Sequence, residues 1–291
     1  MTIRVTQGLI SASSLRGLQS ALGRVQDVQA QLSSGKRISV PSDDPSGTAS
    51  AMTLRSQQAA DVQYLRNIDQ VTARLNVTDT TLTSISDRLR SVRQLLVQAQ
   101  NGALSTESRA ALSAQAGALK GELVDLYNTT YLDRPVFGGT VAGQQAIDPT
   151  TGAYVGNDQP VSTRISRDAT IRVDVKGTDV AADRIAPLLD RITTDLAAGN
   201  AIPSADFDDL DAVASTVIQA LGDVGARTAR IEATKANVDS QRLDLTARIS
   251  ENEEIDLPAT IMNLQSQQVA YQSALGASAK ILQTSLLDYL R

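Results

Sequence analysis

The most constraining feature of the sequence is a narrow apolar row near its start, which repeats in alternating steps of three and four. The row consists of Leu15, Leu18, Leu22, Val25 and Leu32, with Gln29 at the one polar position. This spacing predicts the contact seam of a coiled coil. Because a single helix cannot bury such a seam by itself, the segment requires a partner helix.

A matching row lies at the other end of the chain. It consists of Ile261, Leu264, Tyr271, Leu275 and Leu282, with Gln268 and Ser278 at the polar positions. We therefore expect the first and last helices to pair with each other or with neighbouring copies of the chain. The polar positions either specify the register between subunits or are tolerated in a weak seam.

Two further heptad rows lie between these ends. Ten residues from Ile68 to Ala99 step by three and four, with Thr78 as a polar position, and an apolar residue recurs at every seventh position from Leu210 to Leu245. The segment 209–255 would form a rod of about 70 Å at roughly 1.5 Å per residue. A further helix is expected from about Thr106, its candidate cap, to Thr130.

The pattern changes between residues 134 and 206, where glycine and proline are frequent. Alternating residues at 161–165 and 171–175 predict a hairpin that turns at Arg167-Asp168 and has one wet face. A short helix follows from Asp183, with Pro187 in its first turn and Gly199 at its end. Asp206 or Asp208 would cap the next helix.

The order of these segments predicts a mainly α, elongated fold in which antiparallel long helices from both halves of the chain are nested. Residues 1–40 and 259–291 would form a terminal coiled-coil domain. Residues 41–133 and 207–258 would form a helical rod domain, with Pro258 at the hinge. Residues 134–206 would form a small β-containing insert at the far end.

Composition excludes several function classes. The 27 basic and 32 acidic residues give a net charge of −5, which disfavours nucleic-acid binding. The sequence has no apolar run of 18 residues that would span a membrane. It also has no Cys and no His, which removes thiolate nucleophiles, imidazole bases and the commonest zinc ligands. We expect no enzyme, no cofactor and no metal site.

Adjacent acids at Asp43 and Asp44 are the one pair that suggests a metal or acid–base site. The better interpretation is local, because Asp44 is a good helix N-cap and Pro45 a good first helical residue. Gly35 similarly suits the left-handed residue that ends the first helix. The stretch Phe137-Gly138-Gly139-Thr140 is interpreted as a tight turn, because it lacks the ending of a phosphate-binding loop.

Several of these stretches together resemble the bacterial flagellin superfamily. They are Leu32–Ile38, Pro41–Pro45, Tyr271–Leu275 and Leu282–Leu287. Within the superfamily, Arg4-Val5-Thr6, Pro41, Pro45, Phe137–Thr140 and the small insert are similar to the members that form the hook–filament junction. The stretch Tyr131–Val136 departs from the family pattern.

This resemblance implies a structural subunit of the bacterial flagellum that lies outside the cell and is secreted through the flagellar type III pathway without a cleaved signal. It implies assembly as a homo-oligomeric ring through the terminal helices. The implied partners are a hook-associated protein on the hook side, flagellin on the filament side and an export chaperone. A filament-forming flagellin and a coiled-coil adaptor are the alternatives.

Overall fold

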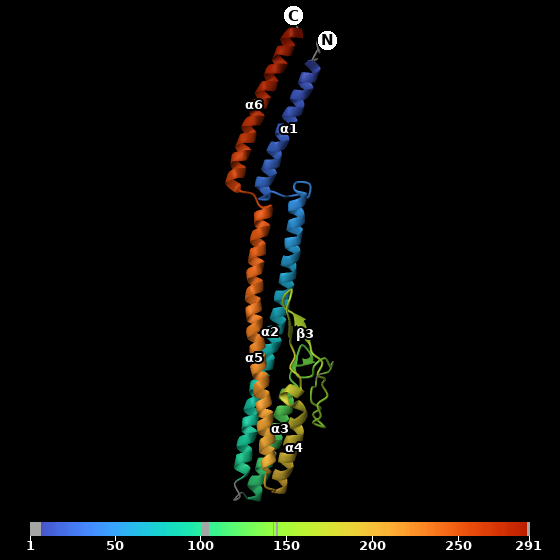
Figure 1. Ribbon diagram of the computed structural model, residues 1–291, viewed down its shortest axis with the longest axis vertical. Coiled ribbons are helices and arrows are strands. Elements are labelled where there is room, and N and C mark those ends of the chain that lie inside the picture. The colour runs from blue at the N-terminus through green and yellow to red at the C-terminus, as the bar shows by residue number, and fades with distance from the viewer. Residues whose placement is uncertain (1–6, 101–104, 142, 144, 290–291) are drawn as a thin grey trace. The chain divides into compact units, whose positions relative to one another are not determined.

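The computed structural model describes residues 7–100, 105–141, 143 and 145–289 (Figure 1). It is mainly helical, as predicted. The helices are α1 (Gln7–Ser34), α2 (Pro45–Ala99), α3 (Thr106–Tyr127), α4 (Ala182–Ala198), α5 (Ser204–Glu253) and α6 (Leu257–Tyr289), with a 3-10 turn, η1, at Thr178–Val180. The strands are β1 (Thr130–Tyr131), β2 (Arg134–Pro135), β3 (Ser162–Arg164) and β4 (Thr170–Arg172).

The chain forms two compact units, residues 1–59 with 242–291 and residues 60–241. The first unit therefore joins the two ends of the sequence, whereas the second unit is one continuous stretch of the chain. The predicted three-domain boundaries stay a prediction.

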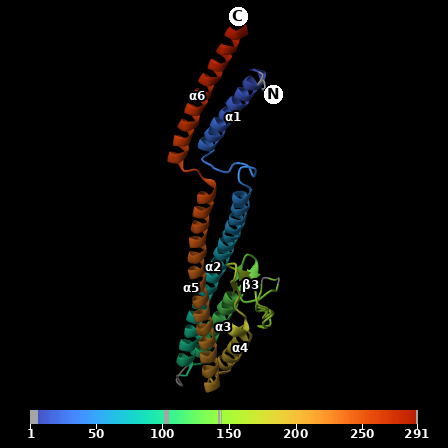
Figure 2. The ribbon, with the colours of Figure 1, turned by 45° about the horizontal axis from the view of Figure 1, so that its top comes forward.

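In the first unit, α1 and α6 pack against each other and run antiparallel (Figures 1 and 2). A hydrogen bond from Arg24 Nε to Gln267 Oε1, at 3.1 Å, links the two helices. The same unit holds the beginning of α2 and the end of α5. The expected pairing of the first and last helices is confirmed.

In the second unit, the heptad rows form the core. All six seventh-position residues of α5, from Leu210 to Leu245, are buried, the last of them within the first unit. The row of α2 from Ile68 to Leu96, Thr78 included, is also buried. Thr78 donates its hydroxyl to the carbonyl of Arg74 at 2.9 Å, which satisfies the hydroxyl inside its own helix. A polar group in this seam therefore needs no partner from another helix.

Helices α3 and α4 pack side by side and extend this core (Figure 1). The Ser113 hydroxyl donates to the carbonyl of Thr193 at 3.2 Å, and Lys120 pairs with Asp190 at 2.5 Å. The N-cap of α3 is Ser105, which accepts the N–H of Ser108 at 3.2 Å. The prediction of Thr106 as the cap was wrong by one residue.

Two other predictions at helix starts were wrong. Helix α4 begins at Ala182, one residue before the predicted Asp183, but Pro187 lies beyond the first turn, inside the helix. Helix α5 begins at Ser204, which places Asp206 in its first turn. There Asp206 is buried and accepts two hydrogen bonds from Arg191, so the carboxylate serves a salt bridge between helices and not a cap. The predicted end at Gly199, with a φ of 74°, is confirmed.

The insert is built from two short antiparallel hairpins, β1–β2 and β3–β4. The second hairpin confirms the predicted alternation, with Ile165, Ile171 and Val173 buried in the core. The face predicted to be wet contains one exception, the buried Asp174. Arg172 holds this carboxylate with two hydrogen bonds of 3.0 and 2.6 Å, which accounts for a charge at that depth.

The insert is fixed to the end of α3 by two residues. The buried Tyr127 donates its hydroxyl to the carbonyl of Val180 at 2.7 Å. Asn128 accepts the N–H groups of Ala146 and Ile147 at 2.7 and 2.8 Å, and its amide donates to the Ile147 carbonyl. The glycine-rich stretch is a tight turn, as predicted. A side chain at Gly139 would meet the carbonyl oxygen of Asn157 at 2.0 Å.

Candidate assembly site

The site predicted from the sequence is the apolar seam of the terminal helices. On α1 the less exposed positions that recur at this spacing are Ser14, Leu18, Ala21, Val25, Val28 and Leu32. On α6 the less exposed positions are Thr260, Leu264, Gln267, Tyr271, Ala274 and Ser278. Both sets keep the alternating three–four spacing, so each helix presents one coiled-coil seam to the other.

Five of the ten predicted seam residues belong to this internal contact. They are Leu18, Val25, Leu32, Leu264 and Tyr271. Four others remain outside it: Leu15 and Leu22 are 60% and 39% exposed, and Ile261 and Leu275 are 41% and 43% exposed. The side chain of Leu282 lies outside the described residues.

The exposed residues form a second row on each helix, displaced in the same sense from the internal seam. Leu15 and Leu22 each follow an inward position of α1 by one residue, and Ile261 and Leu275 do the same on α6. One residue corresponds to a rotation of about 100° around a helix. Because the two helices run antiparallel, rotation in the same sense along each chain points both rows to one side of the pair. The four residues Leu15, Leu22, Ile261 and Leu275, called the exposed strip below, therefore share one face.

The polar seam positions divide in a similar way. Gln29 and Gln268 are exposed and continue the two rows of the exposed strip, whereas Ser278 is half-buried in the internal seam. A glutamine in the strip can hydrogen-bond to water in the monomer and to a neighbouring chain after assembly. Whether these amides specify register stays a prediction.

Helices α1 and α6, called the terminal pair below, are each connected to the rest of the chain by a short segment, α1 to α2 and α6 to α5. These two segments bind each other and anchor the pair. Gly35, with a φ of 69°, ends α1 as predicted. The next residues then run antiparallel to the end of α5: the N–H of Arg37 donates to the Glu253 carbonyl at 2.6 Å, and the N–H of Ile255 donates to the Gly35 carbonyl at 3.2 Å. These bonds join positions more than 200 residues apart in the sequence.

Side chains reinforce this anchor. The Arg37 guanidinium donates to the Asn252 carbonyl at 2.8 Å and to Asp44 Oδ2 at 3.2 Å. Glu253 is buried and accepts Arg55 Nη2 at 2.6 Å. Nothing in the heptad pattern pointed to Glu253, which looks like one more solvated acid at a helix end. Glu253 lies more than 200 residues from the basic pair Lys36-Arg37 in the sequence. The two become neighbours only when the ends of the chain pair, so the sequence alone does not connect them.

The acidic turn before α2 is part of the same anchor. Asp43 Oδ2 accepts the N–H groups of Ser39 and Val40, each at 3.0 Å. Asp44 Oδ1 accepts the N–H of Gly47 at 2.9 Å and so caps α2, as predicted. Backbone donors, from Val40 for Asp43 and from Gly47 for Asp44, hold the pKa of each carboxyl below its usual value. Both acids are structural hydrogen-bond acceptors.

The described residues include no group of three or more His, Cys, Asp or Glu side chains able to hold a metal ion. In the same part of the chain, none of the helices is both long and apolar enough to cross a membrane.

Two family models match the helical parts of the chain on either side of the insert. Residues 6–137 match the bacterial flagellin N-terminal helical region, and residues 208–290 match the bacterial flagellin C-terminal helical region. Together the two matches include all the long helices, and they leave out most of the insert at 134–206.

Among curated relatives, flagellar hook-associated protein 3 of Salmonella typhimurium is 25% identical over 208 residues. That match covers 71% of this chain and 62% of the relative, so it spans less than two thirds of the longer protein. A flagellin of Listeria innocua is 23% identical over 301 residues, which cover 97% of this chain and 96% of the flagellin.

Two solved structures share the fold. The structure of Bacillus cereus FlgL has a TM-score of 0.61 and 20% identity, and covers 68% of this chain and 99% of its own. The flagellar junction protein FlgL of Legionella pneumophila has a TM-score of 0.52 and 12% identity, and covers 62% of this chain and 99% of its own. With matches to both helical regions and this fold, the chain belongs to the bacterial flagellin family, whose members are non-enzymatic structural proteins of the extracellular flagellum.

Proposed function

We propose that this protein forms the junction between hook and filament and assembles there as a ring of subunits through its terminal helices. The observation that carries the assembly mode is the exposed strip on the α1–α6 pair. Four large apolar side chains share one face of a helix pair that is already closed on its other seam. A second copy that lays a helix against this face would remove the strip from water, which is favourable by about 25 cal/mol per Å² of apolar surface.

The position at the junction is supported by relatives. A hook-associated protein and a solved junction protein are among the similar proteins. The resemblance of Pro41, Pro45 and Phe137–Thr140 to junction members points the same way. A junction subunit contacts two different neighbours, so we propose a hook-associated protein on one side and flagellin on the other. An export chaperone would bind the chain before assembly.

A filament-forming flagellin is the second candidate, because the Listeria flagellin matches nearly the whole chain. The two functions differ in whether subunits add to one another without limit. A filament requires contacts that repeat along the axis and never close, whereas a junction layer is closed by symmetry.

Seeded growth separates these functions. Concentrated protein is mixed with sonicated filaments and separately with hooks, and the products are imaged by electron microscopy. We expect no long filaments from this protein alone, and filament growth on hooks when the protein is supplied before flagellin. Long regular filaments of this protein by itself would assign it to the filament-forming members.

A further inference from the structure

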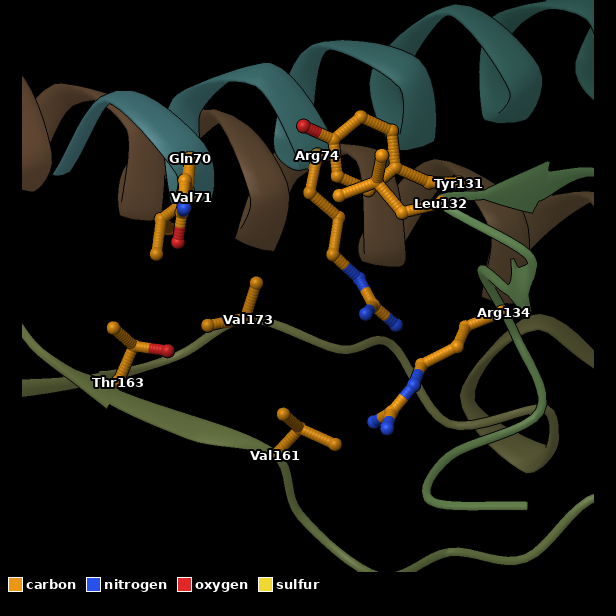
Figure 3. Close-up of a pocket in the computed structure, with 9 residues that line it drawn as sticks. All are labelled: Gln70, Val71, Arg74, Tyr131, Leu132, Arg134, Val161, Thr163 and Val173. Atoms are coloured by element: carbon orange, nitrogen blue, oxygen red, sulfur yellow. The ribbon is translucent and has the colours of Figure 1, made fainter. Parts of the chain in front are cut away.

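A small pocket of the second unit contains the guanidinium group of Arg74, and two of its nitrogen atoms have no hydrogen-bond partner among the described residues. The pocket has a volume of about 230 Å³ and lies between α2, the β1–β2 hairpin and the residues around β3 and β4 (Figure 3). Arg74 enters it from α2, and Arg134 enters it from the hairpin. In Figure 3 the two guanidinium groups point into the same space.

Arg74 is only 9% exposed, and its Nε and Nη2 atoms are buried without a hydrogen-bond partner in the described part of the chain. An arginine remains charged in a protein, so these N–H groups stay hydrogen-bond donors and are not removed by loss of a proton. Burial, partly offset by Asp174, lowers the pKa of Arg74. The side chain is therefore held in a place where its charged donors are unfavourable unless another group accepts them.

Asp174 is the carboxylate whose charge acts on Arg74, but its oxygens already accept other hydrogen bonds. Arg172 binds both of them, and the N–H of Val161 donates to Oδ1 at 2.7 Å. Arg134 makes no ion pair within the part of the chain that the structure describes. Two positive groups thus face the pocket, and no residue that lines it is acidic.

The position of Arg134 is set by an unusual turn. Leu132 and Asp133 occupy the two central positions between β1 and β2, and both have positive φ angles, of 51° and 58°. This conformation normally requires Asn and Gly. The turn pairs Tyr131 with Arg134 across the hairpin and brings both to the pocket. It lies in the stretch that departs from the family pattern.

We propose that this pocket is a binding site for a small oxyanion, such as phosphate, sulfate or a carboxylate, held between Arg74 and Arg134. Guanidinium groups bind such anions with paired, charge-assisted hydrogen bonds. The valines at positions 161 and 173 line the pocket and reduce competition from water. The volume suits a free small anion, which is the occupant we assign. An acidic side chain from another chain would supply the same chemistry.

The test is calorimetric titration of the full-length protein with inorganic phosphate, at constant ionic strength against chloride. The variants are Arg74→Gln and Arg134→Gln, and the matched control is Arg167→Gln, an exposed arginine in the β3–β4 turn outside the pocket. We expect both pocket variants to weaken phosphate binding by about tenfold or more, the loss expected for charge-assisted bonds, and the control to bind as the parent does.

Thermal unfolding gives a second readout. Phosphate and sulfate raise the unfolding temperature of most proteins by exclusion from the surface, so only the difference between variants is informative. We expect a larger rise for the parent and Arg167→Gln than for Arg134→Gln, whose exposed side chain can be replaced without disturbing the fold. Equal rises in all variants, or no phosphate binding by the parent, would overturn the proposal.

The source of the anion is tested by sedimentation of the same variants, read together with the phosphate titration. If Arg134→Gln lowers self-association in sedimentation but the parent binds no phosphate, the acceptor is an acidic side chain of another copy and the free-anion assignment fails. This outcome differs from failure of the proposed junction function, because the seeded-growth assay is carried out without added phosphate and tests assembly alone.

Discussion

At the scale of single residues, local chemistry determines the connection between the terminal pair and α2. Asp44 and Gly35 could be predicted from the sequence because a helix cap and a left-handed helix end depend on neighbours within four residues. Glu253 and Arg74 could not be predicted. Each looks like an ordinary charged residue on a helix, and only the tertiary structure buries it.

The acidic turn should make the anchor sensitive to low pH. The folded pKa of Asp43 and of Asp44 lies below the ordinary value of 3.8, so their stabilising effect is fully present above that value. It is lost as the pH falls through the lower folded pKa. We expect amide exchange at Val40 and Gly47, compared at matched intrinsic rates, to accelerate below pH 3.8.

The Asp43→Asn and Asp44→Asn variants are the controls for this effect. An amide oxygen still accepts hydrogen bonds but does not titrate in this range. Protection in the double variant should therefore lose its dependence on pH. An unchanged acid dependence would assign the effect to other carboxyls.

The turn between β1 and β2 should be improved by ordinary hairpin residues. Replacing Leu132-Asp133 with Asn-Gly relieves two side chains held at positive φ, which we expect to stabilise the fold by about 1 kcal/mol. Urea unfolding measures the change. Leu132→Ala keeps the same backbone strain and serves as the control, with little expected change. A loss of stability in the Asn-Gly variant would show that Leu132 contributes packing that outweighs its strain.

At the scale of elements, the heptad pattern predicted which segments are helical. It predicted less well which side of each helix packs inside the subunit. The rows of α2 and α5 are buried because those helices contribute to one continuous core. In α1 and α6 the leucine and isoleucine residues fall into two neighbouring rows. Small residues such as Ala21 are used inside the pair, while Leu22 remains exposed. A hydrophobicity pattern favours the larger residues and cannot tell an internal seam from one that another chain covers.

This division gives a test with matched variants three residues apart. Leu22→Asp places a carboxylate in the exposed strip, and Val25→Asp places one in the internal seam, where burial of an unpaired charge costs several kcal/mol. We expect Leu22→Asp to keep parental helicity in circular dichroism and to block incorporation onto hooks. Val25→Asp should reduce helicity in the monomer itself.

Leu275→Asp repeats the assembly test on α6. It should resemble Leu22→Asp, because both residues belong to the exposed strip. Normal incorporation of both strip variants would show that subunits associate through another surface.

At the scale of the whole molecule, stability should differ between the terminal pair and the second unit. Among the described positions of α1, only Ala21, Val25 and Val28 are buried, whereas the second unit has a continuous core. Regions with few buried contacts open more readily. Limited proteolysis of dilute monomer should therefore remove the ends first and leave a fragment of roughly residues 42–258, measured by mass spectrometry. Equal resistance of the termini would contradict this expectation.

The pairing of α1 with α6 also has a consequence for synthesis. The hydrogen bond between Arg24 and Gln267 spans 243 residues. A ribosome that adds 5–20 residues per second needs roughly 12–50 s to cover that distance. Throughout this interval α1 exists on the nascent chain before its folding partner has been made. A factor that captures α1 during translation thus meets no competition from α6, and it can hold the chain open before the terminal pair has any opportunity to close.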